Sequence, residues 1–478
     1  MTKSSDRKLL RGGTILAVDP QFDAEFVGDI LIEGKKIVDV APSISVDEAS
    51  TEIIDAGGKI LTPGFVDTHR HLWQSPFRYC GADWLIAHYA KAMWGLAGPI
   101  YTPEDLYLSL RIGLADALNA GVTQVFDWNH NVNSPDHADE TYRAHLNSGA
   151  RVVFGYGQSS PVWADMLDPD IGASGKMPSQ DLERVRKQYY NSNDGLLTLA
   201  MAARGPEVSP MNVVRAESQM AKELGLRSSV HIGNGALAQV RPIELMEREG
   251  LLDETYTWIH CNTISDREIG LIAESGGHAS VAPEIECHMG HGDPAISRLL
   301  DVGVRPSLSV DTCTNVSGDL FAIMRATLSS VRAEANRRIL DTGEMPTEVA
   351  LSASDVLEFA TLQGARANGL GHVTGSLTPG KEADIVIVDT KSPNLLPVSY
   401  AMGSLVMGAN PGNVDTVLVQ GRVVKQDGKL VGLDINHLRN RAEEVRDSLF
   451  ERIGAQKGLW FPDIGTPINN KNYDALNN

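Results

Sequence analysis

Four histidines and one aspartate occupy positions from which a chain of alternating strands and helices could hold a metal ion. His69 and His71 end an apolar run and lie two residues apart, so in a strand both side chains point to the same side. His231, His260 and Asp311 each end a later run of the same kind. Imidazole and carboxylate groups on rigid strands suit zinc or a similar divalent ion. A single strand-end histidine is more often a hydrogen-bonded core residue, but five such groups in one series favour a metal site.

The segment that carries these residues alternates between β-rich runs and helical patterns. The eight β-rich runs are residues 64–71, 122–130, 151–157, 196–204, 227–233, 256–261, 278–283 and 304–311. Several helical patterns between them end at a glycine, as helix C-termini do. Eight such repeats predict a parallel (β/α)8 barrel with its chemistry at the carboxyl ends of the strands. An open doubly wound sheet is the alternative, but no G-x-G-x-x-G follows any strand.

Both ends of the chain are β-rich. Residues 29–33 and 37–40 flank a Gly-Lys turn, and residues 414–419 and 423–424 flank a Gln-Gly turn, so each pair predicts a hairpin. We therefore expect one β-sandwich domain formed by residues 1–62 and 373–434. The barrel would occupy residues 63–372, and residues 435–478 would form a C-terminal helix and a tail.

Composition excludes several classes of protein. The 478 residues are 42% hydrophobic and 22% charged, which is typical of a globular protein with a sizeable core. A net charge of −19 argues against binding to nucleic acid or to an anionic membrane. Four widely spaced cysteines argue against a disulfide framework, and no signal peptide or apolar span of about 18 residues is present. We expect a cytoplasmic enzyme with a small-molecule substrate.

Four motifs resemble those of the amidohydrolase superfamily, in its cytosine-deaminase-like and triazine-hydrolase-like branch. Residues 63–71, PGFVDTHRH, resemble P-G-[FL]-[VI]-[DN]-x-H-x-H, and residues 308–311, LSVD, match the aspartate of strand eight. Residues 375–384, GSLTPGKEAD, and 419–424, VQGRVV, resemble two hairpin motifs near the end of the family's chain. The matches run in order along nearly the whole sequence. The resemblance implies a distorted (β/α)8 TIM barrel with a β-sandwich formed by both termini.

The resemblance also implies a site. His69, His71, His231 and Asp311 would bind one divalent metal ion, with zinc favoured and iron and manganese as alternatives. Binuclear relatives bridge two metals with a lysine on strand four, and residues 196–204 contain none. Asp311 would take a proton from the metal-bound water and pass it to the leaving nitrogen, and His260 would stand beside that water or the substrate. The implied enzyme hydrolyses a non-peptide C–N bond, and homo-oligomers are common in the family and expected here.

The sequence departs from ring-deaminating relatives at strand five. They carry H-x-x-E, where this chain has His231-Ile-Gly-Asn234, and asparagine can hydrogen-bond a substrate but cannot act as an acid. This favours an amide, urea or carbamate, and the H-R-H-x-W-Q stretch at residues 69–74 resembles phenylurea hydrolases. The alternative is a deaminase or dechlorinase of a cytosine, guanine or triazine type heterocycle, with Glu286 or Glu207 as the acid. A catalytically dead binding or assembly protein is disfavoured because all five key positions are retained.

Other residues near strand ends are candidates for contact with the substrate. These are Trp73 and Gln74 after strand one, Trp128 at the end of strand two, and Glu286 and His288 after strand seven. Loops at this end of a barrel usually carry specificity. The alternative for the tryptophans is core packing, and for Glu286 and His288 it is a solvated loop. A second metal at His288 and His291 is disfavoured.

Overall fold

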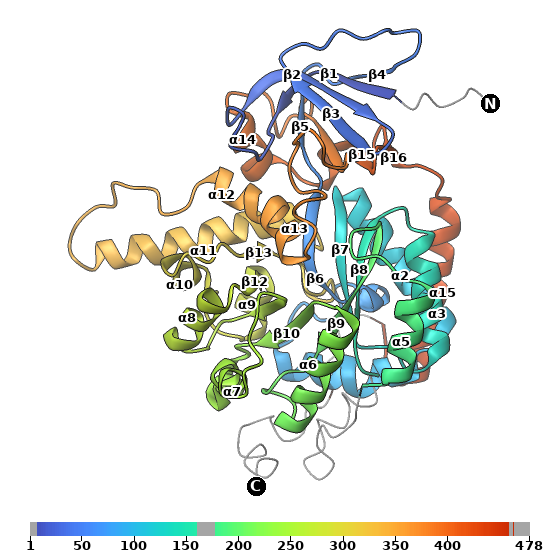
Figure 1. Ribbon diagram of the computed structural model, residues 1–478, viewed down its shortest axis with the longest axis vertical. Coiled ribbons are helices and arrows are strands. Elements are labelled where there is room, and N and C mark those ends of the chain that lie inside the picture. Colours follow the sequence, from blue (N-terminus) through green and yellow to red (C-terminus); the bar gives the residue numbers. More distant parts are fainter. Residues whose placement is uncertain (1–6, 160–176, 458–461, 463–478) are drawn as a thin grey trace.

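The computed structural model describes residues 7–159, 177–457 and 462, and contains two separate β-sheets. Figure 1 shows one sheet at the centre of the larger domain, surrounded by helices, and the other as a smaller domain above it. The smaller domain contains strands from both ends of the chain. This arrangement confirms the predicted fold class.

The central sheet is entirely parallel and has eight strands in chain order. They are β6 (Phe65–Arg70), β7 (Val122–Asn129), β8 (Arg151–Tyr156), β9 (Leu197–Ala203), β10 (Ser228–Ile232), β11 (Tyr256–His260), β12 (His278–Val281) and β13 (Ser307–Leu308). Each strand coincides with one of the β-rich runs in the sequence. The eight β/α repeats therefore fold as their alternation predicts.

Helices cover the outside of the barrel or extend from it. The α-helices are α1 (Ile86–Tyr89), α2 (Pro103–Asn119), α3 (Pro135–Leu146), α5 (Ser179–Gln188), α6 (Met211–Leu224), α7 (Pro242–Arg248), α8 (Asp266–Ser275), α9 (Pro283–Met289), α10 (Ile296–Asp301), α11 (Leu320–Leu340), α12 (Ala353–Glu358), α13 (Gly364–Ala367), α14 (Ala401–Gly403) and α15 (Ile435–Ile453). The 3-10 and π segments are η1 (Leu72–Phe77), η2 (Ala90–Ala97), η3 (Gly98–Ile100), η4 (Gly235–Val240), η5 (Phe359–Gln363), η6 (Ser404–Gly408) and η7 (Pro411–Asn413).

The barrel closes through Asp311, which lies just beyond the shortest strand, β13, and forms a parallel bridge with Arg70 of β6. Strand β13 has only two residues, although the sequence predicts a strand over residues 304–311. Beyond it, the Asp311 amide donates to the His69 carbonyl at 2.9 Å, and the His71 amide donates to the Asp311 carbonyl at 2.8 Å. Asp311 has a positive φ of 64°, which takes the chain out of a regular ladder. Closure is therefore made by the same residues that the sequence singled out for chemistry.

The terminal sheet contains β1 (Arg7–Ile15), β2 (Phe26–Glu33), β3 (Lys36–Ala41), β4 (Glu52–Asp55), β5 (Lys59–Pro63), β14 (Ile385–Asp389), β15 (Val414–Val419), β16 (Arg422–Gln426) and β17 (Lys429–Leu430). Antiparallel pairing of β5 with β14 joins the two ends of the chain. The predicted hairpins are confirmed as β2–β3 and β15–β16. A small apolar core, which includes Ile30, Leu61 and Ile385, lies within this domain.

The C-terminal helix α15 packs on the barrel. The Phe450 ring lies 5.3 Å from that of Phe77, and the Arg452 guanidinium donates to Asp105 at 2.7 Å. The expected tail falls on residues 458–461 and 463–478, outside the described residues. All four cysteines are free, and no described helix is long and apolar enough to cross a membrane.

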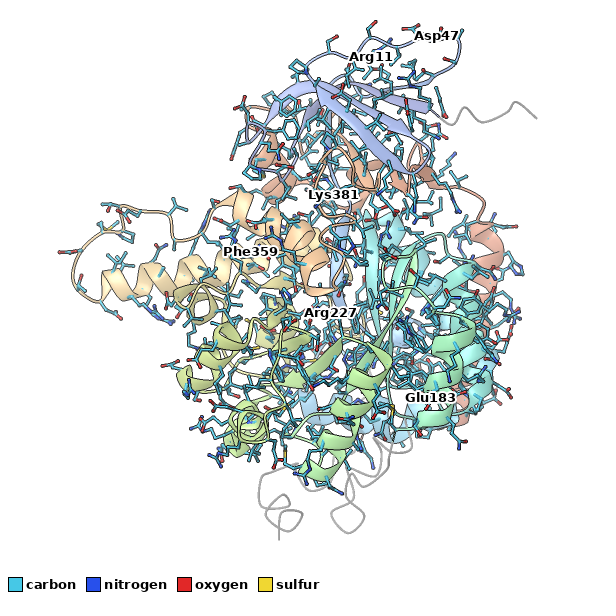
Figure 2. All side chains as sticks on the ribbon, viewed as in Figure 1. Arg11, Asp47, Glu183, Arg227, Phe359 and Lys381 are labelled. Atoms are coloured by element: carbon cyan, nitrogen blue, oxygen red, sulfur yellow. The ribbon has the colours of Figure 1, made fainter. Side chains whose placement is uncertain are left out.

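A buried ion pair joins the terminal domain to the barrel. Arg151 on β8 donates to Asp384 at 2.8 Å and to Glu382 at 2.7 Å, and all three side chains are almost completely buried. Asp384 ends the GSLTPGKEAD motif, so the structure gives this motif a role in joining the domains. In Figure 2, Lys381 of the same segment lies between the terminal sheet and the barrel.

Replacement of Arg151 by methionine should destabilise the protein strongly. The change leaves the buried Asp384 without its cation and Glu382 with Lys35 alone, and loss of one partner of a buried pair costs roughly 3–5 kcal/mol. The free energy of unfolding would be measured in urea. The control is Glu183→Ala on the exposed face of α5 (Figure 2), where substitution should change stability by roughly 0.5 kcal/mol or less. Equal effects of the two substitutions would contradict the prediction.

Candidate active site

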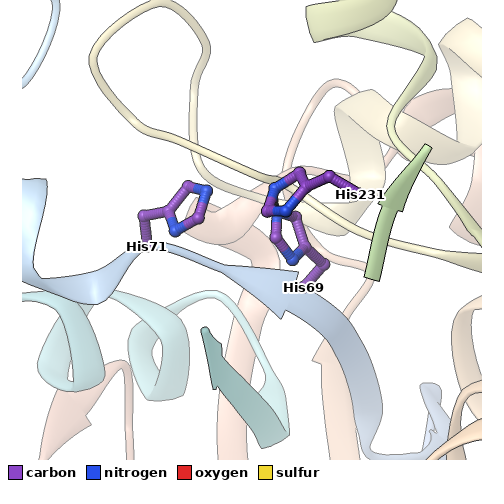
Figure 3. A group of neighbouring side chains, drawn as sticks. All are labelled: His69, His71 and His231. Atoms are coloured by element: carbon purple, nitrogen blue, oxygen red, sulfur yellow. Dashed lines mark hydrogen bonds between the residues drawn. The ribbon is translucent and has the colours of Figure 1, made fainter. Parts of the chain in front are cut away.

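Five side chains converge at the carboxyl ends of the barrel strands. The His69 Nε2 atom lies 3.1 Å from His231 Nε2 and 3.2 Å from Asp311 Oδ1. His71 Nε2 lies 3.3 Å from the same Asp311 oxygen, and His260 Nε2 lies 3.8 Å from the other. Figure 3 shows the rings of His69 and His71, carried by β6 and its end, beside that of His231 from β10.

The chemistry of this donor set fits a divalent metal ion. Burial, followed by the neighbouring histidines, holds the pKa of His69 and of His231 well below the usual value, so both rings are neutral and can offer a lone pair. Ligand atoms of His69, His71 and His231 lie within 4.8 Å of one another, and so do those of His69, His260 and Asp311. Neutral imidazoles with one carboxylate are typical ligands of zinc.

Hydrogen bonds behind two of these rings fix their orientation. His71 Nδ1 donates to the Trp128 carbonyl at 2.8 Å, which leaves Nε2 facing the other ligands. His260 Nδ1 donates to Glu286 at 3.2 Å, and the same Glu286 oxygen accepts from the Ala282 amide at 2.7 Å. Burial alone would lower the pKa of His260, but the carboxylates of Glu286 and Asp311 outweigh it and raise that pKa. His260 is therefore held as a hydrogen-bond donor.

The loops after β10 and β11 approach each other closely behind the site. His260 and Cys261 have φ values of 76° and 64°, and Gly233 has 78°. A side chain at position 233 would place Cβ only 2.4 Å from the Asn262 amide, so only glycine fits between His231 and Asn234. Two of the converging residues, His260 and Asp311, are thus among the non-glycine residues with positive φ, a backbone strain often found at functional sites.

A cavity of about 560 Å³ opens beside the converging side chains. Its apolar lining residues are Ile86, Tyr89, Trp94, Trp128, Val208, Leu237 and Met289. Its polar lining residues are His71, His130, His231, Asn234, His260, His291 and Asp311. No lysine or arginine stands among these residues, so within the described chain the cavity wall offers no cation to a carboxylate or phosphate.

The structure brings only some of the predicted substrate contacts to this cavity. Asn234 and Trp128 line it. Gln74 is buried behind it, where it donates to the Tyr89 hydroxyl at 2.7 Å, and Trp73 packs on the ring of His130 at 5.3 Å. Neither is among the lining residues, and each instead contacts a residue that is.

Glu286 and His288 are also absent from the cavity lining. Glu286 is buried behind His260 and does not line the cavity, because its oxygen binds the ring and the Ala282 amide. His288 is exposed on α9 and is not a lining residue. His291, three residues further on, is buried and lines the cavity.

The sequence analysis predicted no substrate contact for several of the residues that line the cavity, and His291 is one of the polar ones. Burial, with His260 as the second cause, lowers the pKa of His291 to about 3, so its ring is neutral. Tyr89, Trp94 and Leu237 come from α1, η2 and η4, short segments whose path depends on packing. The only sequence signal for His291 is its place in the loop after strand seven.

A second carboxyl lies next to the site. Glu207, in the loop after β9, accepts from the Gly233 amide at 2.6 Å and from the Asn234 side-chain amide at 3.0 Å. Burial raises the pKa of Glu207 to about 7, against the hydrogen bonds from Asn234 and Gly233, which lower it. Glu207 is therefore both the support of Asn234 and an ionisable group near neutral pH.

With this fold and this donor set, the chain belongs to the amidohydrolase family, whose sequence profile matches residues 60–424. The resemblance inferred from the motifs is thereby confirmed, and the chain is a hydrolase of that family. It is 29% identical over 438 residues to the 5'-deoxyadenosine deaminase of Methanothermobacter thermautotrophicus, covering 88% of this chain and 95% of that one. It is 25% identical over 456 residues to the 5-methylthioadenosine/S-adenosylhomocysteine deaminase of Caldicellulosiruptor saccharolyticus, covering 93% and 99%.

Solved structures share the fold. A zinc-bound adenosine deaminase of Xanthomonas campestris superposes with a TM-score of 0.77 at 21% identity, over 93% of this chain and 98% of that one. The zinc complex of an atrazine chlorohydrolase of Arthrobacter aurescens TC1 superposes with a TM-score of 0.76 at 21% identity, over 92% and 100%. Both of these neighbours hold zinc, as the donor set of this chain would allow.

Purified protein should contain close to one zinc ion per chain. The reason is that the ligands converge on one place and that β9 carries no lysine to bridge a second ion. Elemental analysis should show that His231→Ala loses most of the metal, while His288→Ala, which changes an exposed histidine, keeps it. Two ions per chain, or unchanged metal content in His231→Ala, would contradict this prediction.

Glu207 should make the stability of the protein depend on pH. Its pKa rises from 4.5 to about 7 on folding, so between these values the folded state holds a proton that the unfolded chain has lost. The stabilisation of the folded state by the Glu207 proton is fully present below pH 4.5 and is lost as the pH rises through 7. The loss in the free energy of unfolding is a few kcal/mol, at about 1.4 kcal/mol per pKa unit. Urea unfolding at pH 5 and pH 8 should show a smaller change in Glu207→Gln than in the wild type. The same change in both proteins would show that Glu207 does not titrate in this range.

Proposed function

We propose that this chain hydrolyses the C–N bond of an uncharged amide, urea or carbamate, using one divalent metal ion, with zinc favoured. The observation that carries the proposal is Asn234, which lines the cavity beside the metal-ligand group at the position where ring deaminases place an acid. A carbonyl substrate needs no protonated ring nitrogen. The apolar lining without a cation supports an uncharged substrate.

Each polar group of the site has a role in this reaction. When bound, a divalent ion polarises a carbonyl and lowers the pKa of water to about 7. Asp311 accepts the proton of the attacking water and passes it to the leaving nitrogen. His260, held by Glu286 with a raised pKa, donates a hydrogen bond to the oxygen on which negative charge develops.

The cavity wall positions the substrate and excludes water. Trp94 and Trp128 offer flat apolar surfaces, and Leu237 and Met289 add to the same wall. Such walls suit a planar or aromatic body attached to the reacting group. Expulsion of water strengthens the hydrogen bonds made by Asp311 and His260.

A second candidate is deamination of a nitrogen heterocycle. It is supported by relatives named as deaminases of 5'-deoxyadenosine and of 5-methylthioadenosine or S-adenosylhomocysteine. In this case Glu207 would be the acid, because it is buried next to Asn234 with a pKa of about 7. Glu286 is less suited, since it lies behind His260.

We further propose a cytoplasmic location, because the cysteines are free, and a homo-oligomeric state, because the chain resembles a family in which homo-oligomers are common.

A substrate panel tests the proposal. We expect amine or ammonia release from anilides, arylureas or arylcarbamates, and none from adenosine-type nucleosides or aminotriazines. The reason is that Asn234 cannot protonate a ring nitrogen. Ammonia release from an aminated heterocycle, together with no turnover of any carbonyl compound, would move the assignment to the deaminase.

The Asp311→Asn variant shows whether the activity comes from this site. It should remain folded by circular dichroism and lose roughly 10²–10⁴-fold in kcat, the usual contribution of a positioned acid or base. Metal content measured on the same sample separates loss of the proton acceptor from loss of the ion. Full turnover by this variant with metal retained would assign the proton transfer to another group.

A further inference from the structure

The side-chain amide of Asn234 is held in one orientation. Glu207 is completely buried and receives three donors, which are the Gly233 amide at 2.6 Å, the Asn234 side-chain Nδ2 at 3.0 Å and the Asn234 backbone amide at 3.4 Å. When Glu207 is ionised it only accepts hydrogen bonds, so Nδ2 then faces Glu207 and Oδ1 faces away from it. Because Asn234 lines the cavity, the atom that it offers to a substrate is the acceptor Oδ1.

His291 stands beside Asn234 on the same wall. The Gly235 amide donates to the His291 carbonyl at 3.0 Å, which joins the loop after β10 to the loop after α9. The His291 ring is 3% exposed, lies 4.6 Å from the ring of His260, and has no hydrogen-bond partner for either nitrogen within the described chain. A buried imidazole without partners is costly, and a ligand in the cavity can supply them.

An acceptor at position 234 selects among chemical groups. It matches a nitrogen that already bears a hydrogen, as in a secondary amide, a urea or a carbamate. It opposes a ring nitrogen with an in-plane lone pair, because two acceptors would then face each other in a cavity with little water. A glutamate at the same position could avoid this conflict by protonation, which asparagine cannot do.

We propose that Asn234 and His291 form a recognition pair for the N–H group of a neutral secondary amide, urea or carbamate, with Glu207 as the residue that fixes the polarity of the pair. Asn234 Oδ1 accepts the substrate N–H, and a ring nitrogen of His291 binds a second polar atom of the same group. This inference rests on the proposed function and narrows its substrate class. Glu207 does not line the cavity, so it acts through Asn234 as a positioning residue.

The test compares two substrates that differ only in one hydrogen-bond donor. Acetanilide and phenyl acetate are the simplest pair, since oxygen replaces N–H without a change in shape. The fastest N–H substrate of the panel and its ester or carbonate analogue form a second pair. The measured quantity is the ratio of kcat/KM for the N–H compound to that for the oxygen compound, at pH 8, where Glu207 is ionised. The intrinsic reactivities cancel when this ratio is compared between variants.

Asn234→Ala should lower the ratio by roughly tenfold, the value of one hydrogen bond. Glu207→Gln should lower it by at least as much, because a glutamine amide facing Asn234 turns the asparagine around and presents Nδ2 to the substrate. A merely structural role of Glu207 would reduce both rates together and leave the ratio unchanged. His291→Ala should raise KM for both compounds with little change in kcat, and His291→Asn should restore part of the affinity.

The control is His372→Ala, which removes an exposed histidine after α13 and should change neither the ratio nor KM. Unchanged ratios in Asn234→Ala and Glu207→Gln, or an unchanged KM in His291→Ala, would overturn the inference while hydrolysis of amides or ureas upholds the proposed function. Turnover of adenosine-type rings without turnover of any carbonyl compound would overturn both.

Discussion

The closure of the barrel at Asp311 is the constraint on which the site depends. Two backbone hydrogen bonds tie Asp311 to His69 and His71, and they join the last strand of the barrel to the first. The same bonds bring the carboxylate of Asp311 to within 3.3 Å of both imidazole rings. Residues more than two hundred positions apart thus meet because the backbone hydrogen bonds at Asp311 fix the register of closure. The ligand group is therefore a consequence of the fold and needs no flexible loop.

Burial gives these groups their chemical properties. The histidines lose charge because desolvation lowers the pKa of His69, His71 and His231, and neutral imidazole is the form that binds a metal. His260 is the exception, because Glu286 lies directly behind it and raises its pKa. The buried Glu286 carboxylate thus makes His260 a hydrogen-bond donor, whereas the other three histidines are neutral and can bind a metal. The surrounding apolar wall strengthens each of these effects by excluding water.

In the proposed function, position 234 separates this chain from its deaminase relatives. Those relatives match nearly the whole chain, and a solved adenosine deaminase shares its fold. At position 234 the chain carries the amide of asparagine. The nearby carboxyl group belongs to Glu207, in the loop after β9, and accepts a hydrogen bond from that amide. The fold places a polar group at this point of the cavity, and under the proposed function an amide there recognises an N–H group where an acid would protonate a ring.

The sequence alone determined the barrel, the terminal β domain and the five groups at strand ends, because these follow from local periodicity and from the parity of residues along a strand. It did not decide which of the polar residues outside the strands reach the cavity. His288 and His291 lie on the same short segment, yet one is exposed and the other lines the site, since the Gly235–His291 hydrogen bond sets the path of the loop. Gln74 and Glu286 likewise became supports of Tyr89 and His260, because contacts distant in sequence turned them away from the cavity. Such choices are made by the packing of neighbouring loops, which no local pattern records.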